Sequence, residues 1–307
     1  MGYDTNEENL SLVKDICKQN GIGCQKIEKA TSGYTNITFF VDDKYVIKII
    51  NLFTKPEKLQ KEIDFYKHIK LDFIPEYVAS GKIGDKDYLI VKKLQGKSLY
   101  CVWHSLIDKQ RLDVTKQIAN ILNSFHEHDG GFLQPKFKQT DWVQKWKDSF
   151  SLNINILNKK GFDTSFLQDF LEMKLETIFC ENKPCLIYND AHFDNFIYDE
   201  GRVYLIDFDR VLFCSIDYEL LVIKMMIDDP TKFASEYTAQ FVHDEDFDAI
   251  YNLFKQYAPD MFDFKYINER VFVYQFIYYL GQGYETNNLT WIGEQLNKFK
   301  QFFGYTN

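Results

Sequence analysis

The segment from Leu186 to Asp209, LIYNDAHFDNFIYDEGRVYLIDFD, constrains the possible folds of this chain more than any other. It places a carboxylate after each of two apolar runs. Asp190 comes after the run at 186–188, and Asp207 comes after the run at 204–206. Short apolar runs bounded by turn residues are typical of buried strands. The pattern therefore predicts two short strands with polar side chains at their ends.

The second of these strands is predicted to belong to a hairpin. The turn signal Asp-Glu-Gly at 199–201 separates the apolar run at 196–198 from the run at 203–206. The open end of this hairpin would bring Asn195, Asp207 and the earlier Asp190 together. Two carboxylates and an amide at one spot favour a bound cation, and oxygen ligands of this kind suit Mg²⁺. The alternative is that these Asp and Asn side chains only cap a loop.

Composition excludes several classes of protein. The 307 residues carry a formal net charge of −9, so a basic surface for nucleic acid is not expected. The N-terminus lacks the design of a signal peptide, and no apolar run approaches the length of a membrane span. The six cysteines lack zinc-ligand spacing. We therefore expect a cytoplasmic protein with no membrane and no nucleic-acid partner.

The pattern of apolar residues changes along the chain. Turn signals break residues 20–94 into strand-like runs, with one helix expected from Pro56 to Lys70. From Gln110 onward the spacing is helical, interrupted only by the two strands described above. This predicts an α+β fold, with an N-terminal antiparallel sheet carrying one helix and a mostly helical C-terminal lobe. The boundary is expected at Leu94-Gln95-Gly96, which gives lobes of residues 1–94 and 95–307.

Lys48 lies in the run YVIKII, which is apolar on both faces. A buried ammonium group without an anionic partner is costly, so Lys48 needs a carboxylate nearby. In the expected helix, Glu62 falls on the same face as the apolar Leu59 and Tyr66. Glu62 is therefore predicted to face inward and to pair with Lys48. The alternative is a surface lysine and a solvated glutamate.

The segment at 186–209 resembles the catalytic loop and metal-binding segment of the aminoglycoside phosphotransferase and choline kinase family, relatives of the protein kinases. The resemblance implies a protein-kinase-like two-lobe fold. It also implies that Asp190 orients or deprotonates the attacking hydroxyl, and that Asn195 and Asp207 hold Mg²⁺. This chain has Tyr188-Asn189-Asp190 where the family usually has His-Gly-Asp, and His192 where the family often has histidine.

The resemblance extends to a nucleotide site. It implies that Lys48, held by Glu62, contacts the α- and β-phosphates of ATP or GTP. The stretch KATSGYTNITFF looks like the family's nucleotide-covering loop, with Ser32 and Gly33 at its tip. A plain hairpin turn is the alternative there. The main chain from Val91 to Lys93 is similar to the strand and linker that meet the adenine.

The sequence also predicts roles for two further aspartates. Asp217 begins a helix-like stretch and is expected to be an N-cap that braces the catalytic loop. Asp209 is expected either to lie in the outer shell of the metal or to face the substrate.

These observations lead to the hypothesis of a kinase that transfers the γ-phosphate of ATP or GTP to a hydroxyl of a small molecule. Residues 211–307 hold twice as many acidic as basic side chains. An acidic wall would attract a cation, so a cationic, aminoglycoside-like acceptor is the first expectation. Aromatic side chains are expected to add cation–π contacts: Tyr274, Phe276, Tyr278 and Trp291. The alternatives are a choline, ethanolamine or sugar kinase, or an inactive nucleotide-binding protein of the same fold.

Overall fold

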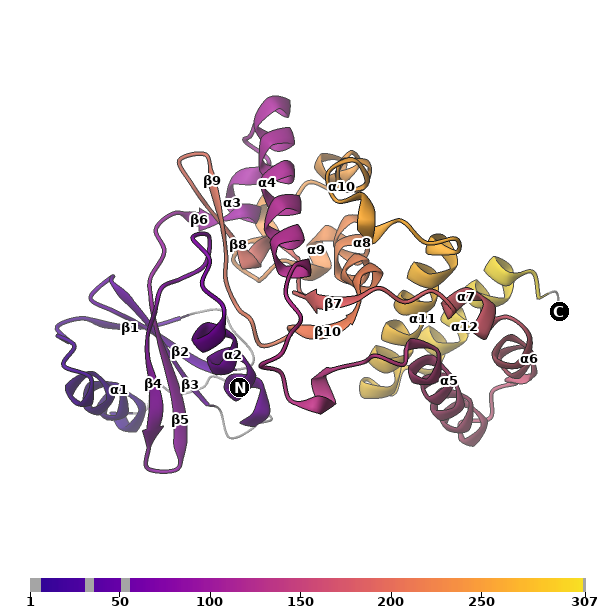
Figure 1. The fold of residues 1–307 in the computed structure, drawn as a ribbon, viewed down its shortest axis with the longest axis horizontal. Helices are drawn as coiled ribbons and strands as arrows, with labels where there is room; N and C mark the ends of the chain where they lie inside the picture. Colours follow the sequence, from indigo (N-terminus) through magenta and orange to yellow (C-terminus); the bar gives the residue numbers. More distant parts are fainter. Residues whose placement is uncertain (1–6, 31–35, 51–55, 306–307) are drawn as a thin grey trace.

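The computed structural model describes residues 7–30, 36–50 and 56–305. Figure 1 shows an antiparallel sheet formed by the N-terminal part of the chain, with a mostly helical C-terminal part beside it. The fold is therefore α+β, as predicted from the change in apolar spacing. Within the described residues, no helix is long and apolar enough to cross a bilayer.

The N-terminal sheet has five antiparallel strands in the order β1-β2-β3-β5-β4. They are β1 (Ile27–Lys29), β2 (Asn36–Val41), β3 (Tyr45–Ile50), β4 (Tyr77–Ile83) and β5 (Lys86–Lys92). One face packs on α1 (Glu7–Gln19) through Val13 and Ile16. The other face packs on α2 (Pro56–His68) through Leu59 and Ile63. The helix between β3 and β4 thus begins where the sequence predicted and ends two residues earlier.

The link between the sheet and the helical part depends on Gly96. Its φ is +105°, and a Cβ at this position would lie 2.4 Å from the carbonyl oxygen of Tyr198. A residue with a side chain does not fit this close approach. Beyond the glycine come β6 (Lys97–Ser98), α3 (Leu99–Trp103) and α4 (Asp108–His126).

The predicted hairpin is present as β8 (Phe196–Asp199) and β9 (Arg202–Leu205), with Phe196 opposite Leu205. β6 extends this hairpin to three strands. The run before Asp190 forms β7 (Pro184–Ile187), which pairs with β10 (Leu212–Ser215). After Gln110, where the sequence indicated two strands, the structure has four, β7 to β10; the four residues of β10 lie beyond the segment that carried the strand signal.

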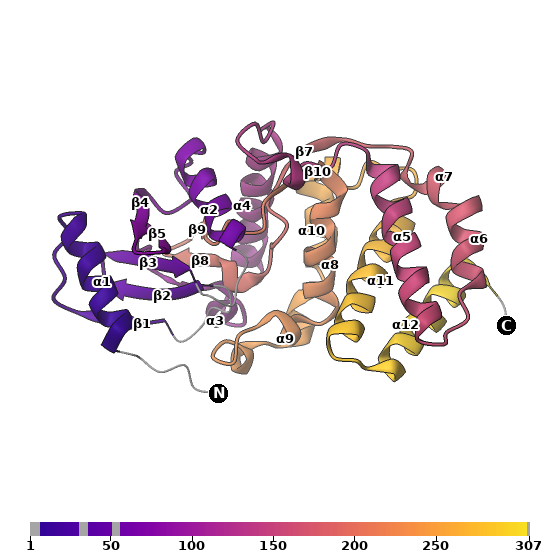
Figure 2. The same ribbon diagram turned by 90° about the horizontal axis from the view of Figure 1, so that it is seen from below.

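The remaining helices complete the C-terminal part. They are α5 (Trp142–Lys159), α6 (Ser165–Met173), α7 (Leu175–Phe179), α8 (Leu220–Asp228), α9 (Pro230–Phe233), α10 (Ile250–Tyr257), α11 (Ile267–Glu285) and α12 (Leu289–Phe303). Figure 2 shows α5, α6, α11 and α12 gathered at the end of the molecule away from the sheet. Phe150 of α5, Phe170 of α6 and Phe299 of α12 pack against one another between these helices. Figure 1 shows β7 and β10 between the N-terminal sheet and this group of helices.

Candidate active site

The loop after β7 carries Asp190. The residue before it, Asn189, has a φ of 59°, a left-handed conformation that Asn tolerates better than most residues. Glu219, which is fully buried, fixes this turn: its two carboxylate oxygens accept hydrogen bonds from the backbone N–H groups of Tyr188 and Asn189 at 2.7 and 2.8 Å. This predicted catalytic loop is therefore braced by Glu219, a carboxylate to which no sequence pattern pointed.

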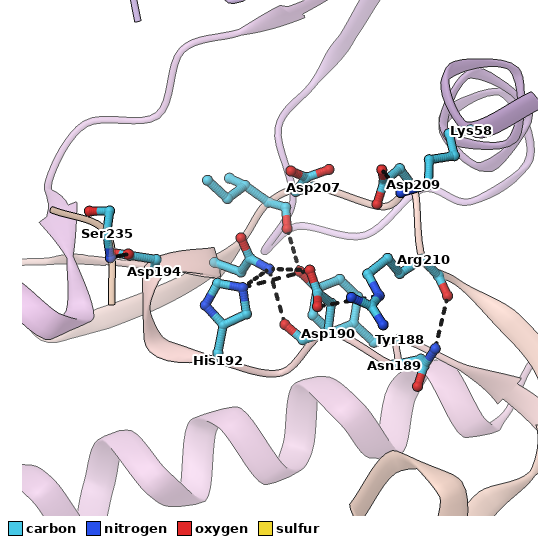
Figure 3. A network of polar contacts seen from close by, with 12 residues as sticks. Lys58, Tyr188, Asn189, Asp190, His192, Asp194, Asp207, Asp209, Arg210 and Ser235 are labelled. Atoms are coloured by element: carbon cyan, nitrogen blue, oxygen red, sulfur yellow. Dashed lines mark hydrogen bonds and ion pairs between the residues drawn. The ribbon is translucent and has the colours of Figure 1, made fainter. Parts of the chain in front are cut away.

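The Asp190 carboxylate is surrounded by three polar side chains (Figure 3). Asn195 Nδ2 donates to Asp190 Oδ2 at 2.9 Å, and His192 Nε2 lies 3.6 Å from the same oxygen. Arg210 Nε lies 3.5 Å from Asp190 Oδ1. Burial raises the pKa of Asp190, but His192, Arg210 and Asn195 together outweigh burial and hold the pKa below its ordinary value. Asp190 is therefore a carboxylate at neutral pH, as a general base must be.

The hairpin brings Asn195 and Asp207 together as predicted, since the backbone N–H of Ile206 donates to the Asn195 carbonyl oxygen at 3.0 Å. The Asp207 side chain is 37% exposed. Asn195 Oδ1 accepts no hydrogen bond from the residues that the structure describes, because its Nδ2 faces Asp190. Within the same described part, no three His, Cys, Asp or Glu side chains form a metal cluster. An amide and a carboxylate oxygen fit Mg²⁺, which takes further oxygens from phosphates and water.

Lys48, on β3 of the N-terminal sheet, contacts the predicted metal ligand Asp207. Its Nζ lies 2.7 Å from Glu62 Oε1 and 3.2 Å from Asp207 Oδ1, so the predicted pair with Glu62 is present. Burial lowers the pKa of Lys48, but Asp207 and Glu62 outweigh it and raise the pKa above its ordinary value. Burial raises the pKa of Glu62 to about 7, against the opposing effect of Lys48. We conclude that Lys48 stays charged and that Glu62 is the member of the pair that titrates.

The other predicted nucleotide contacts divide into two groups. Ser32 and Gly33 lie outside the described residues. Val91 lies within β5, opposite Val46 of β3 and Tyr77 of β4, where the sheet itself uses the main chain. Lys93 follows the strand, and its backbone N–H donates to the carbonyl oxygen of Lys44 at 2.8 Å. The adenine contact therefore stays a prediction.

Asp217 is not the N-cap that the sequence predicted. It lies within a short 3₁₀ turn, Ile216–Glu219, and its buried carboxylate binds Arg270 of α11 at 2.6 Å and the hydroxyl of Tyr274 at 2.5 Å. It thereby ties this turn to α11 rather than to the catalytic loop. Asp209 is only 4% exposed and pairs with Lys58 at 3.6 Å, and its two expected roles, in the outer shell of the metal or facing the substrate, stay predictions.

The residues expected to bind a cationic acceptor are only partly available. Tyr274 and Phe276 are buried in the core, so the prediction that they form cation–π contacts with a substrate was wrong. Several of the acids are paired: Asp228 with Lys224, Asp246 with Arg111, and Asp263 with Lys183. Asp244 and Glu245 are exposed, and their turn packs on the loop that carries Asp190, since Phe247 of the turn contacts Phe193 of the loop at 5.2 Å between ring centroids.

Solved structures with the same architecture come from aminoglycoside kinases. The gentamicin complex of APH(2″)-IIa is 20% identical, with a TM-score of 0.64 over 98% of this chain and 97% of that chain. The GDP complex of aminoglycoside 2′-phosphotransferase-IIIa is 18% identical, with a TM-score of 0.67 over 96% and 98%. ADP-bound APH(2″)-Ib is 21% identical, with a TM-score of 0.66 over 93% and 96%. The fold is therefore that of the kinase-like phosphotransferases.

The sequence itself gives the family. A family model described as the phosphotransferase enzyme family matches residues 26–251, which is most of the chain and includes both the Lys48 and the Asp190 segments. The protein belongs to this phosphotransferase enzyme family. A search of curated proteins gave no match.

Proposed function

We propose that the protein transfers the γ-phosphate of ATP or GTP, in the presence of Mg²⁺, to a hydroxyl group of a small molecule. The observation that carries this proposal is the meeting of three distant segments at one place. Lys48 of β3 lies between Glu62 of α2 and Asp207, which follows β9, while Asp190 contacts Asn195 at the start of the same hairpin. A protein that had lost activity would be expected to lack at least one of these five residues.

In the proposed reaction, Asp190 orients the acceptor hydroxyl and takes its proton as the oxygen attacks the γ-phosphorus. The new O–P bond forms while the bond to the bridging oxygen of the nucleotide breaks, and the electron pair leaves with the diphosphate. Asn195 and Asp207 would hold Mg²⁺, which neutralises charge on the phosphates when bound. Lys48, oriented by Glu62, steadies the phosphates. Positioning and charge stabilisation supply most of the catalysis in such reactions.

The remaining nucleotide contacts are proposed from the family resemblance. Ser32 and Gly33 would cover the phosphates with backbone N–H groups. The main chain around Val91 to Lys93 would meet the base. The ADP complex of one similar structure and the GDP complexes of others support a purine nucleotide without choosing between ATP and GTP.

For the acceptor, we propose a cationic hydroxyl compound, with aminoglycosides as the first class to test. Support comes from the gentamicin and kanamycin complexes of similar structures. The exposed acids Asp244 and Glu245 beside the catalytic loop also favour a cation. Choline, ethanolamine and neutral sugars are the classes to test next.

Replacing the base tests the proposal directly. Asp190→Asn should lower turnover by about 100-fold or more, the range for a lost general base, while the dissociation constant of MgATP stays near that of wild type. Asp148→Asn, on the exposed face of α5, is the matched control and should leave turnover unchanged. The measurement is steady-state phosphate transfer over a panel of aminoglycosides, amino alcohols and sugars. Normal turnover in Asp190→Asn would show that the base is another group.

A further inference from the structure

Arg210 contacts Asp190, and the proposed reaction has not yet given this arginine a role. It follows the buried Asp209, and its backbone carbonyl oxygen lies 3.5 Å from Asn189 Nδ2. Its side chain points toward the Asp190 carboxylate (Figure 3) and is 39% exposed. The segment that follows Asp207 thus places a guanidinium group beside Asp190, the proposed base.

Most of the donors of this guanidinium are free. Nε faces Asp190 Oδ1 at 3.5 Å, and neither terminal nitrogen donates a hydrogen bond to any residue that the structure describes. An arginine that only held Asp190 in place would be expected to use its paired donors on the carboxylate. A partly exposed fork with unused donors matches the geometry of a phosphate group.

The position of the Arg210 guanidinium fits that expected for the transferred phosphoryl group. An attacking hydroxyl lies within about 3 Å of its base, and the phosphorus within about 3.5 Å of the attacking oxygen. The phosphoryl oxygens therefore lie within about 7 Å of the Asp190 carboxylate, and Arg210 lies beside that same carboxylate. Lys48 is already engaged by Glu62 and Asp207 on the nucleotide side.

The charges around Arg210 keep it cationic. Burial is the largest single effect and lowers the pKa of Arg210, but Asp190, Tyr278, Asp209 and Tyr218 together outweigh burial and raise the pKa above its ordinary value. During transfer, charge is spread over the three equatorial oxygens of the phosphoryl group, and a fixed cation at that point stabilises the transition state.

We propose that Arg210 is a catalytic residue that binds the phosphoryl group in flight, on the acceptor side, through its free terminal nitrogens. Its contact with Asp190 holds the base and the phosphoryl-binding guanidinium in fixed positions relative to each other. This inference rests on the proposed function, because it assigns Arg210 to the same transfer step. It also means that an ammonium group of a cationic acceptor must lie away from Arg210.

Binding of a transition-state mimic separates this role from a structural one. The probe is MgADP with aluminium fluoride, compared with MgADP alone, by titration calorimetry. Wild type should bind the fluoride complex more tightly than MgADP. Arg210→Gln should lose about 100-fold of that gain, the range for one lost transition-state contact, with unchanged affinity for MgADP. Arg210→Lys, which keeps the charge without the fork, should lose less. Arg202→Gln, an exposed arginine on β9, is the matched control and should lose nothing.

The outcomes separate two failures. If wild type gains no affinity from aluminium fluoride, the proposed phosphotransfer fails and Arg210 has no such role. If wild type gains affinity and Arg210→Gln keeps it within twofold, only the role of Arg210 is overturned. A rise in acceptor KM with unchanged kcat in Arg210→Gln would also overturn it, because Arg210 would then bind the acceptor and not the phosphoryl group.

Discussion

The pair of Lys48 and Glu62 shows how one buried residue sets the charge state of the site. Glu62 is fully buried, and only one of its oxygens faces Lys48, while the other has no hydrogen-bond partner among the described residues. An incompletely satisfied carboxylate in a buried position binds a proton more readily than it does in water. The pair itself was predictable, because a lysine in an apolar strand requires an anion. The raised pKa was not, because it depends on how many donors reach each oxygen.

The pH dependence of activity follows from this raised pKa. Because the pKa of Glu62 is about 7, lowering the pH below 7 protonates it and breaks the ion pair that orients Lys48. The value of kcat/KM for the nucleotide, which reports the free enzyme, should therefore fall below about pH 7. Asp190 does not contribute to this fall, since its pKa lies below its ordinary value. Glu62→Gln, measured from about pH 5.5 to 8.5, should be less active but flat across pH 7. A fall at the same pH in Glu62→Gln would assign the titration to another group.

The turn after β10 shows what element-level prediction can and cannot resolve. Asp217 and Glu219 lie two residues apart in one 3₁₀ turn, and they point to different partners: α11 for Asp217 and the catalytic loop for Glu219. With about three residues per turn, positions two apart face in clearly different directions. The sequence indicated a bracing carboxylate here, but it assigned Asp217, because the turn was read as an ordinary helix start. The hairpin β8–β9 was predicted correctly, since its turn signal and apolar runs are unambiguous.

Removing the brace should separate catalysis from nucleotide binding. Glu219→Gln puts an amide N–H group against the backbone N–H groups of Tyr188 and Asn189, so a buried charged hydrogen bond is lost. We expect the free energy of unfolding to fall by about 1.5–3 kcal/mol. Turnover should fall at least about tenfold through misplacement of Asp190, with the KM for nucleotide unchanged. Glu176→Gln, a 72% exposed carboxylate paired with Lys147, is the control. Urea unfolding and steady-state kinetics measure both effects, and equal turnover in the two variants would contradict the bracing role.

At the scale of the whole molecule, the sequence predicted the order of sheet and helices but not how charge is distributed. We propose that the boundary between two lobes lies near Leu94-Gln95-Gly96, where the close approach of the chain to Tyr198 requires glycine. The excess of acids in residues 211–307 is a property of composition, yet their pairing depends on the fold. Asp246, for example, is bound by Arg111, which lies more than a hundred residues earlier. Such long-range partners reduce the field that composition alone suggests.

Asp244 and Glu245, which form no ion pair with a residue that the structure describes, define the last prediction. Asp244 and Glu245 are exposed before α10, and their turn packs on the catalytic loop through Phe247. A cationic acceptor should therefore show a KM that rises with salt, because screening limits the reach of these charges to about 8 Å at physiological ionic strength. A neutral sugar should show no rise. Replacing both acids, as Asp244→Asn with Glu245→Gln, should raise the KM for the cation at low salt and flatten its salt dependence. Asp260→Asn, exposed beyond the other end of α10, is the control and should behave as wild type.

If the double variant keeps the full salt dependence, these acids do not steer the acceptor. If only neutral or anionic alcohols are phosphorylated, the cationic acceptor is wrong while the kinase assignment stands.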